Sequence, residues 1–207
     1  MIECKWYIGN SLVLLLSLII IVSCSNNESK KFQDLKNHRF SDLSFNLPGV
    51  FVETSIDELI ESWSNTDSPQ EVVNSKIEYY ELLRPREQWI SLYVDSTNLN
   101  STVMVFVGPY IKINKWTSQQ MFQMLEKRLR SEADELGVEF KPIENNFYPL
   151  NNGNDLLKIK FEWNSTTERT FGTQYLLNTN ESTYGFIVMN DYDDFEGIIR
   201  SGRQIQD

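Results

Sequence analysis

An apolar run from Leu12 to Val22 determines which residues of this 207-residue chain are expected to form a folded domain. The run is shorter than the roughly 18 apolar residues that a membrane-spanning helix needs, and its length is typical of the apolar centre of a secretory signal peptide. Polar residues follow directly from Ser23. Cleavage at this boundary would leave residues 24–207, which are enough for one domain with its own hydrophobic core.

The end of the run, Ile21-Val22-Ser23-Cys24, resembles the lipobox of bacterial lipoproteins. The resemblance implies cleavage between Ser23 and Cys24, transfer of a diacylglyceryl group to the Cys24 thiol, and acylation of the new amino terminus. Two or more acyl chains anchor a protein durably, whereas one chain does so only marginally. We therefore expect a signal peptide over residues 1–23 and a lipid anchor at Cys24, facing the periplasm or the surface of the bacterial cell envelope. The alternative is an uncleaved signal anchor, because the residues before Leu12 lengthen the segment.

Cysteine and histidine usage narrows the chemistry of the folded domain. Cys4 lies in the expected leader, so no thiol is left for a disulfide, a cysteine nucleophile or a thiolate metal site. The single histidine, His38, excludes a His-rich zinc site, and the sequence has no Gly-x-Ser-x-Gly motif. We expect no metal centre, no cofactor and no identifiable catalytic residue, and we interpret His38 as a structural side chain.

The net charge of −10 excludes another class of partner. An acidic chain is repelled by phosphate backbones and by anionic lipid surfaces, so nucleic acid is not an expected ligand. The same acidity also keeps a protein soluble, and this simpler explanation is sufficient. The expected partners are a membrane, reached through the lipid anchor, and another protein.

Residue patterns divide the rest of the chain into a polar tether, residues 24–39, and one domain, residues 40–207. Leu43, Phe45 and Leu47 alternate with polar residues and predict a half-buried strand over 40–49. Ser55 and Glu58 resemble a helix capping box and predict a helix over 55–63. Three strands in an antiparallel meander are predicted next, over 76–83, 88–95 and 102–107.

The second half of the chain has the clearest periodicity. Apolar residues spaced by three and four predict an amphipathic helix from Thr117 or Ser118 to Leu136, with Gly137 as its stop. Alternating apolar residues then predict four strands, over 138–142, 156–163, 170–178 and 183–189. A closing helix is expected from Asp191, burying Tyr192, Phe195, Ile198 and Ile199.

This order of elements resembles the Mog1, PsbP and DcrB group of proteins. The residues that carry the likeness are an opening strand ending in Leu47-Pro48, the long helix that ends at Gly137, and the closing pattern from Phe171 to Phe195. The resemblance implies an α+β fold, an α/β/α sandwich around a central antiparallel sheet. It also implies binding of other proteins rather than catalysis, since relatives include lipoproteins and adaptors that hold apolar segments of secreted toxins.

Two groups of side chains are candidates for a site. Trp89, Tyr93, Trp116 and Tyr148 could form an aromatic surface that binds a peptide or sugar, although a second layer of structure over the sheet would bury them instead. The acids Asp191, Asp193, Asp194 and Glu196 could hold calcium, but their spacing lacks the glycine and distal glutamate of a calcium loop. Stabilisation of a helix N-terminus accounts for these acids without a metal.

The sequence therefore predicts a lipid-anchored envelope protein that acts as a non-catalytic binding module for a protein or ligand. Two alternatives stay open, a carboxylate-based envelope hydrolase and a toxin immunity or adaptor protein. A hydrolase should have a deep cleft with two carboxylates roughly 5 to 10 Å apart. A toxin adaptor should instead have an exposed apolar groove.

Overall fold

The computed structural model describes residues 34–150, 155–166, 169–179, 181–190 and 194–204. The expected signal peptide, with Ser23 and Cys24, lies outside these ranges, as do Asp191, Tyr192 and Asp193. The central strands are β3 (Phe51–Thr54), β4 (Ile90–Asp95), β5 (Asn98–Pro109), β6 (Glu139–Pro149), β7 (Asp155–Asn164), β8 (Arg169–Asn178) and β9 (Ser182–Asn190). The helices are α2 (Ile56–Ser64), α3 (Gln70–Leu83), the 3-10 helix η1 (Arg84–Trp89), α4 (Ser118–Glu135) and α5 (Glu196–Ile199). A small second sheet contains β1 (Leu35–Phe40), β2 (Leu43–Pro48) and β10 (Arg203–Gln204).

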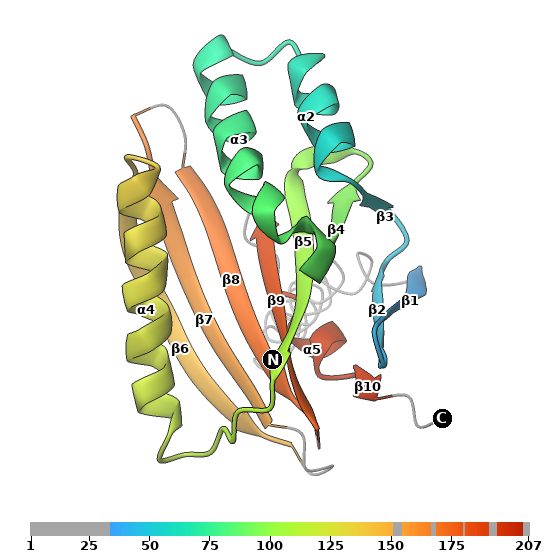
Figure 1. Cartoon of the computed structure of the whole chain (residues 1–207), viewed down its shortest axis with the longest axis vertical. Helices are drawn as coiled ribbons and strands as arrows, with labels where there is room; N and C mark the ends of the chain where they lie inside the picture. Colours follow the sequence, from blue (N-terminus) through green and yellow to red (C-terminus); the bar gives the residue numbers. More distant parts are fainter. Residues whose placement is uncertain (1–33, 151–154, 167–168, 180, 191–193, 205–207) are drawn as a thin grey trace, which may run out of the picture.

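The central sheet has the strand order β3-β4-β5-β9-β8-β7-β6, and all its neighbouring pairs are antiparallel (Figure 1). After β5 the chain crosses to the far edge of the sheet through α4. It then returns strand by strand from β6 to β9, which pairs with β5 and closes the sheet. This arrangement confirms the predicted fold class, α+β with a central antiparallel sheet.

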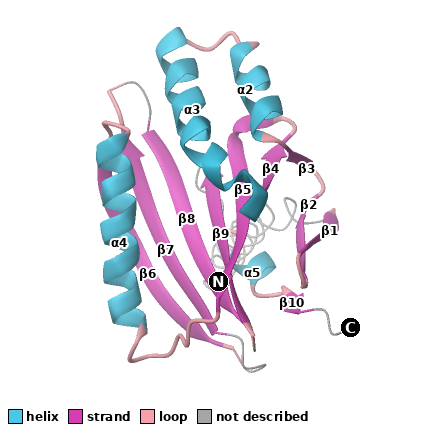
Figure 2. Cartoon of the chain, in the orientation of Figure 1, coloured by secondary structure: helices cyan, strands magenta, loops and turns pink. Residues whose placement is uncertain are grey.

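Each face of the sheet carries its own hydrophobic layer. Helices α2, α3 and α4 lie on one face, where Leu59, Leu129 and Ile159 belong to one buried cluster (Figure 2). The opposite face is covered by β2 and α5, which bury Phe45 and Ile199 against Tyr93, Tyr175, Phe186 and their neighbours. The second layer is therefore mainly a strand layer with one short helix. No helix in the described ranges is long and apolar enough to cross a bilayer.

Local signals in the sequence account for several of these elements. The capping box predicted before α2 is present, since Ser55 Oγ accepts from the Glu58 backbone N–H and Glu58 Oε2 accepts from the Ser55 backbone N–H. The long helix is confirmed as α4 and ends before Gly137, whose φ of 67° lies in the left-handed region that glycine adopts readily. Alternation correctly located β2 and the strands β7, β8 and β9.

The predicted strand over 76–83 is wrong, because these residues belong to α3. The short stretch Lys76-Ile77-Glu78-Tyr79 alternates like a strand, but over the longer segment Val73, Tyr80 and Leu83 fall on one buried helical face. The first strand of the predicted three-strand meander is therefore the second helix of a helical hairpin, α2–α3. After η1, the other two predicted strands are present as the antiparallel pair β4–β5. The folded part also begins earlier than residue 40, since Leu35–Phe40 forms β1 and pairs along the whole of β2.

Candidate functional site

A groove with a volume of about 480 Å³ lies between α3–η1 and α4, on the helical face of the sheet. Figure 1 shows these two helical walls on the same face, with β8 and β9 visible between them. The volume falls in the range typical of ligand pockets, which are lined mostly by apolar side chains with a few polar groups. The apolar lining residues are Tyr79, Leu82, Leu83, Trp89, Ile90, Met104, Phe106, Val107, Leu136 and Ile187.

The floor of the groove comes from β5 and β9. Ile187 lies opposite Met104 in the register, and Phe106 lies opposite Gly185. A Cβ atom placed on Gly185 would come within 1.9 Å of the Phe106 ring. Only glycine at position 185 leaves room for this ring to lie across β9, so Gly185 sets the shape of the floor.

The groove has one polar patch on its α4 wall. Arg128 Nη2 donates to Gln174 Oε1 at 2.6 Å, and Arg128 Nε lies 3.3 Å from Glu132 Oε1. Gln174 is fully buried and lies opposite Ile187 in the sheet, so this polar contact forms at the boundary between floor and wall. Across the groove, burial raises the pKa of the Tyr79 hydroxyl. The remaining charged residues at the rim are Arg86 and Glu135.

The four aromatic residues of the predicted binding surface do not meet in one place. Trp89 ends η1, is 65% exposed and lines the groove. Tyr93 is completely buried on the opposite face, where β1 and β2 cover it and His38 packs edge-on against its ring at 4.8 Å. Trp116 is 88% exposed in the loop before α4, and Tyr148 is half-buried on β6. Tyr93 thus drops out of the candidate surface, because the layer that covers its face buries it.

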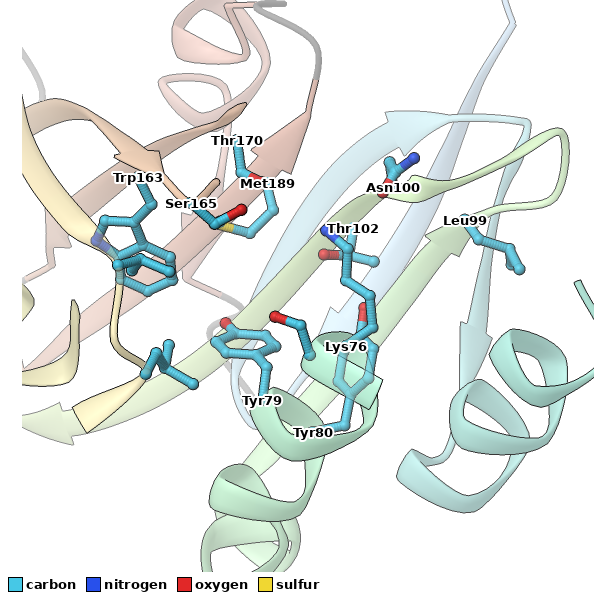
Figure 3. A pocket seen from close by; sticks show the side chains of 13 residues that line it. Lys76, Tyr79, Tyr80, Leu99, Asn100, Thr102, Trp163, Ser165, Thr170 and Met189 are labelled. Atoms are coloured by element: carbon cyan, nitrogen blue, oxygen red, sulfur yellow. The ribbon is translucent and has the colours of Figure 1, made fainter. Parts of the chain in front are cut away.

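A second, smaller cavity of about 60 Å³ lies beyond Tyr79, which lines both cavities (Figure 3). Its wall includes Lys76, Asn100, Thr102 and Trp163. The Lys76 ammonium lies 5.5 Å from the centre of the Trp63 ring. A space of this size and polarity suits ordered water rather than a larger ligand. The larger groove is therefore the better candidate for a binding site.

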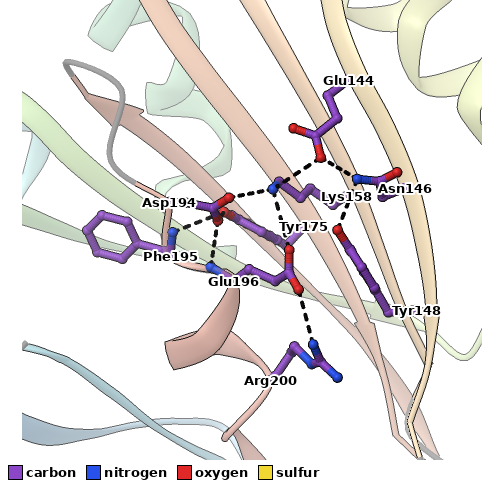
Figure 4. A network of polar contacts seen from close by, with 9 residues as sticks. All are labelled: Glu144, Asn146, Tyr148, Lys158, Tyr175, Asp194, Phe195, Glu196 and Arg200. Atoms are coloured by element: carbon purple, nitrogen blue, oxygen red, sulfur yellow. Dashed lines mark hydrogen bonds and ion pairs between the residues drawn. The ribbon is translucent and has the colours of Figure 1, made fainter. Parts of the chain in front are cut away.

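A network of ion pairs lies on the opposite face of the sheet, around the buried Lys158 of β7 (Figure 4). Lys158 Nζ donates to Asp194 Oδ2 at 2.5 Å and lies 3.4 Å from Glu196 Oε2 and 3.5 Å from Glu144 Oε1. The Tyr175 hydroxyl donates to Asp194 Oδ1 and accepts from the backbone N–H of Phe195. These contacts hold the start of α5 against the sheet.

The protonation equilibria of this network favour ionised partners. Burial opposes the charged form of Lys158, but the hydrogen bond to Asp194 and the nearby carboxylates outweigh it and raise the pKa of Lys158. Burial also opposes ionisation of Asp194, yet the bond from Lys158 and its other hydrogen bonds lower the pKa of this carboxyl. A general acid needs a raised pKa, so Asp194 is suited to a structural ion pair rather than to acid catalysis.

The sequence did not single out Lys158. It lies between the apolar residues Leu157 and Ile159 of β7, and a charged residue that alternates with apolar ones in a strand normally faces water. The acidic segment near residue 194 was interpreted as helix-capping residues, and Asp194 does accept a hydrogen bond from the backbone N–H of Glu196 at the start of α5. The pattern did not reveal that Asp194 also pairs with Lys158. Within the described ranges, no group of three His, Cys, Asp or Glu side chains is arranged to hold a metal ion.

Comparison with solved structures identifies the fold. The solution structure of the cyanobacterial PsbP protein, CyanoP, from Synechocystis sp. PCC 6803 superposes with a TM-score of 0.54 over 84% of this chain and 95% of that chain, at 8% sequence identity. The chain has a PsbP-like fold. A protein of unknown function from Pseudomonas aeruginosa, described as a putative regulator, matches with a TM-score of 0.31 and 7% identity over 79% of this chain and 88% of that chain. This second similarity is too weak to bear on the fold.

No family model and no curated protein sequence matches the chain. At 8% identity the match to CyanoP concerns the PsbP-like fold alone, because unrelated functions are built on the same fold. The function must therefore be argued from the groove and from the sequence.

Proposed function

We propose that this protein is a lipid-anchored binding protein of the bacterial cell envelope, which holds an apolar ligand or an apolar segment of another protein without catalysis. The groove between α3–η1 and α4 is the observation that supports binding. It combines a floor of Met104, Phe106 and Ile187 with an indole, Trp89, that is 65% exposed at its edge. A concave site lined by apolar side chains, with an aromatic ring exposed at its edge, is typical of ligand pockets.

The arrangement of carboxylates favours binding over hydrolysis. The two acids at the groove, Glu132 and Glu135, are on the same helical wall, whereas glycoside hydrolysis needs carboxylates on both sides of the scissile bond. The carboxylates around Lys158 are engaged with its ammonium group. Of the two alternatives from the sequence, an adaptor with an apolar groove is closer to this geometry than a hydrolase.

Isolation of the protein from detergent-solubilised envelopes tests the binding proposal. Ile187→Trp places a larger side chain in the groove, and Val52→Trp adds the same side chain at an exposed position outside it. We expect a partner, identified by mass spectrometry, to accompany the native protein and the Val52 variant but not the Ile187 variant. Equal recovery with all three proteins would exclude the groove as the binding site.

Lipid anchoring predicts a defined chemical change at Cys24. The mature protein should begin at Cys24 and carry acyl groups, because the lipobox requires a thiol at this position. We expect Cys24→Ala to remain as the full-length precursor with its leader attached. Intact-protein mass spectrometry measures both forms. An uncleaved native protein, or a free thiol at Cys24, would instead favour the signal anchor.

A further inference from the structure

The loop between β5 and α4 presents a group of exposed apolar side chains at one end of the molecule. Tyr110 is 47% exposed, Ile111 is 41% exposed and Trp116 is 88% exposed. We refer to residues 110–116 as the Tyr110–Trp116 loop. Figure 1 shows it at the bottom of the view, at the opposite end from the turn that joins α2 and α3.

The loop is held in one conformation by contacts within the described structure. Ile113, in its middle, is buried in the core beneath the helices. Asn114 Oδ1 accepts from the backbone N–H groups of Trp116 and Thr117, at 2.8 and 3.1 Å. The Ile111 backbone N–H donates to Thr183 Oγ1 at 2.9 Å and ties the loop to β9. The exposed rings are therefore presented by a rigid turn.

The charge of the loop differs from that of the chain as a whole. Lys112 and Lys115 are its only charged residues, and the sequence has no acid between Asp95 and Glu126. The register brings two acids to the same end of the sheet, Asp155 at the start of β7 and Glu181 next to β9. The loop itself is cationic and aromatic on a chain with a net charge of −10.

Tryptophan and tyrosine favour the boundary between lipid and water, and lysine favours anionic headgroups. We propose that the Tyr110–Trp116 loop is a membrane-contacting loop, with Trp116 in the interfacial region of the bilayer and Lys112 and Lys115 at anionic headgroups. This inference rests on the proposed lipid anchor, which keeps the domain near the bilayer. The ten residues from Ser25 to Asp34 span up to about 35 Å when extended, so the anchor leaves the domain free to turn this end towards the lipid. The loop would then fix the orientation of the groove relative to the membrane.

Quenching of tryptophan fluorescence by brominated lipids tests the proposal on the acylated protein. The protein is reconstituted in vesicles of phosphatidylethanolamine and phosphatidylglycerol, and flotation measures the bound fraction separately. We expect brominated acyl chains to quench the native protein, and Trp116→Phe to abolish this quenching. Trp63→Phe makes the same change at a buried tryptophan of α2 that does not line the groove, and it serves as the matched control, which should leave the quenching unchanged.

The lysines provide a second test. Lys112→Gln and Lys115→Gln are made as separate single variants. In phosphatidylglycerol vesicles, each should shift the equilibrium between inserted and free loop about fivefold towards the free loop. The same changes should have no effect in vesicles of phosphatidylcholine alone.

The possible results distinguish failure of the loop proposal from failure of the lipid-anchor proposal. A protein that floats with the vesicles but whose Trp116 is not quenched would overturn the loop proposal and leave the anchor intact. Shielding of Trp116 that depends on another protein rather than on lipid would equally overturn it. A native protein that neither floats nor is quenched would overturn both proposals.

Discussion

Replacing Gly185 with alanine is expected to lower the free energy of unfolding by about 3 kcal/mol and to obstruct the groove. The added methyl group would meet the Phe106 ring at 1.9 Å, well inside van der Waals contact. Overpacking of this kind typically costs about 1–3 kcal/mol, since neighbouring side chains leave their preferred rotamers. The ring would have to move towards the groove, whose floor it forms. Chemical denaturation measures the loss of stability.

Two further variants separate the contact with Phe106 from a general effect of alanine in a strand. Gly108→Ala, also in the central sheet, places its Cβ at an ordinary 3.8 Å from Thr183 O and should be close to neutral. In the double variant Gly185→Ala/Phe106→Leu, the smaller side chain should restore part of the stability lost with Gly185→Ala alone. If the loss of stability in the double variant equals the sum of the losses in Gly185→Ala and Phe106→Leu, the clash with Phe106 is not the cause of the destabilisation.

Replacing Lys158 with methionine is expected to destabilise the protein by about 2 kcal/mol. The change leaves Asp194, Glu196 and Glu144 close together without their shared cation. Breaking a fully buried ion pair costs about 3–5 kcal/mol, and the partial exposure of these carboxylates reduces the expected loss. Arg200→Met removes a half-exposed ion pair to Glu196 and should cost less than about 1 kcal/mol.

The stability contributed by this network should depend on pH in a defined direction. The pKa of Asp194 is lowered in the folded state, so its contribution is complete above its ordinary value of 3.8 and is lost as pH falls through the lowered pKa. The pKa of Lys158 is raised, so its contribution is complete below 10.5 and is lost as pH rises beyond that value. The difference in free energy of unfolding between the native protein and Lys158→Met should therefore be largest between about pH 4 and 10, as measured by chemical denaturation. A constant difference down to pH 2 would contradict the ion-pair explanation.

Local sequence patterns were sufficient for much of the fold. The capping box located α2, the apolar stripe located α4, and alternation located β7, β8 and β9. Segment 70–83 was harder, since its second half alternates locally like a strand while the whole segment has helical periodicity. The strand β1 was hidden in a polar stretch, because its stability comes from pairing with β2 rather than from its own apolar residues.

The candidate site could be predicted only in part, because it is formed by residues far apart in the chain. Trp89 was singled out from the sequence and does line the groove, but its neighbours Leu136 and Ile187 are brought to it by the path of α4 and by the insertion of β9 beside β5. Trp116 was also singled out, although it lies in a separate exposed loop. Burial of Tyr93 depends on β2 folding over its face, which periodicity within β4 cannot reveal.

Binding of an apolar fluorophore to the purified protein tests the role of the groove most directly. Nile red emission should increase on titration with the native protein and with Val52→Trp. Ile187→Trp should weaken this binding by about tenfold or more, since about 1.4 kcal/mol of lost apolar contact is enough for a factor of ten. Equal affinity of Nile red for the native protein and Ile187→Trp, with both proteins folded, would contradict the proposal that this groove is the binding site.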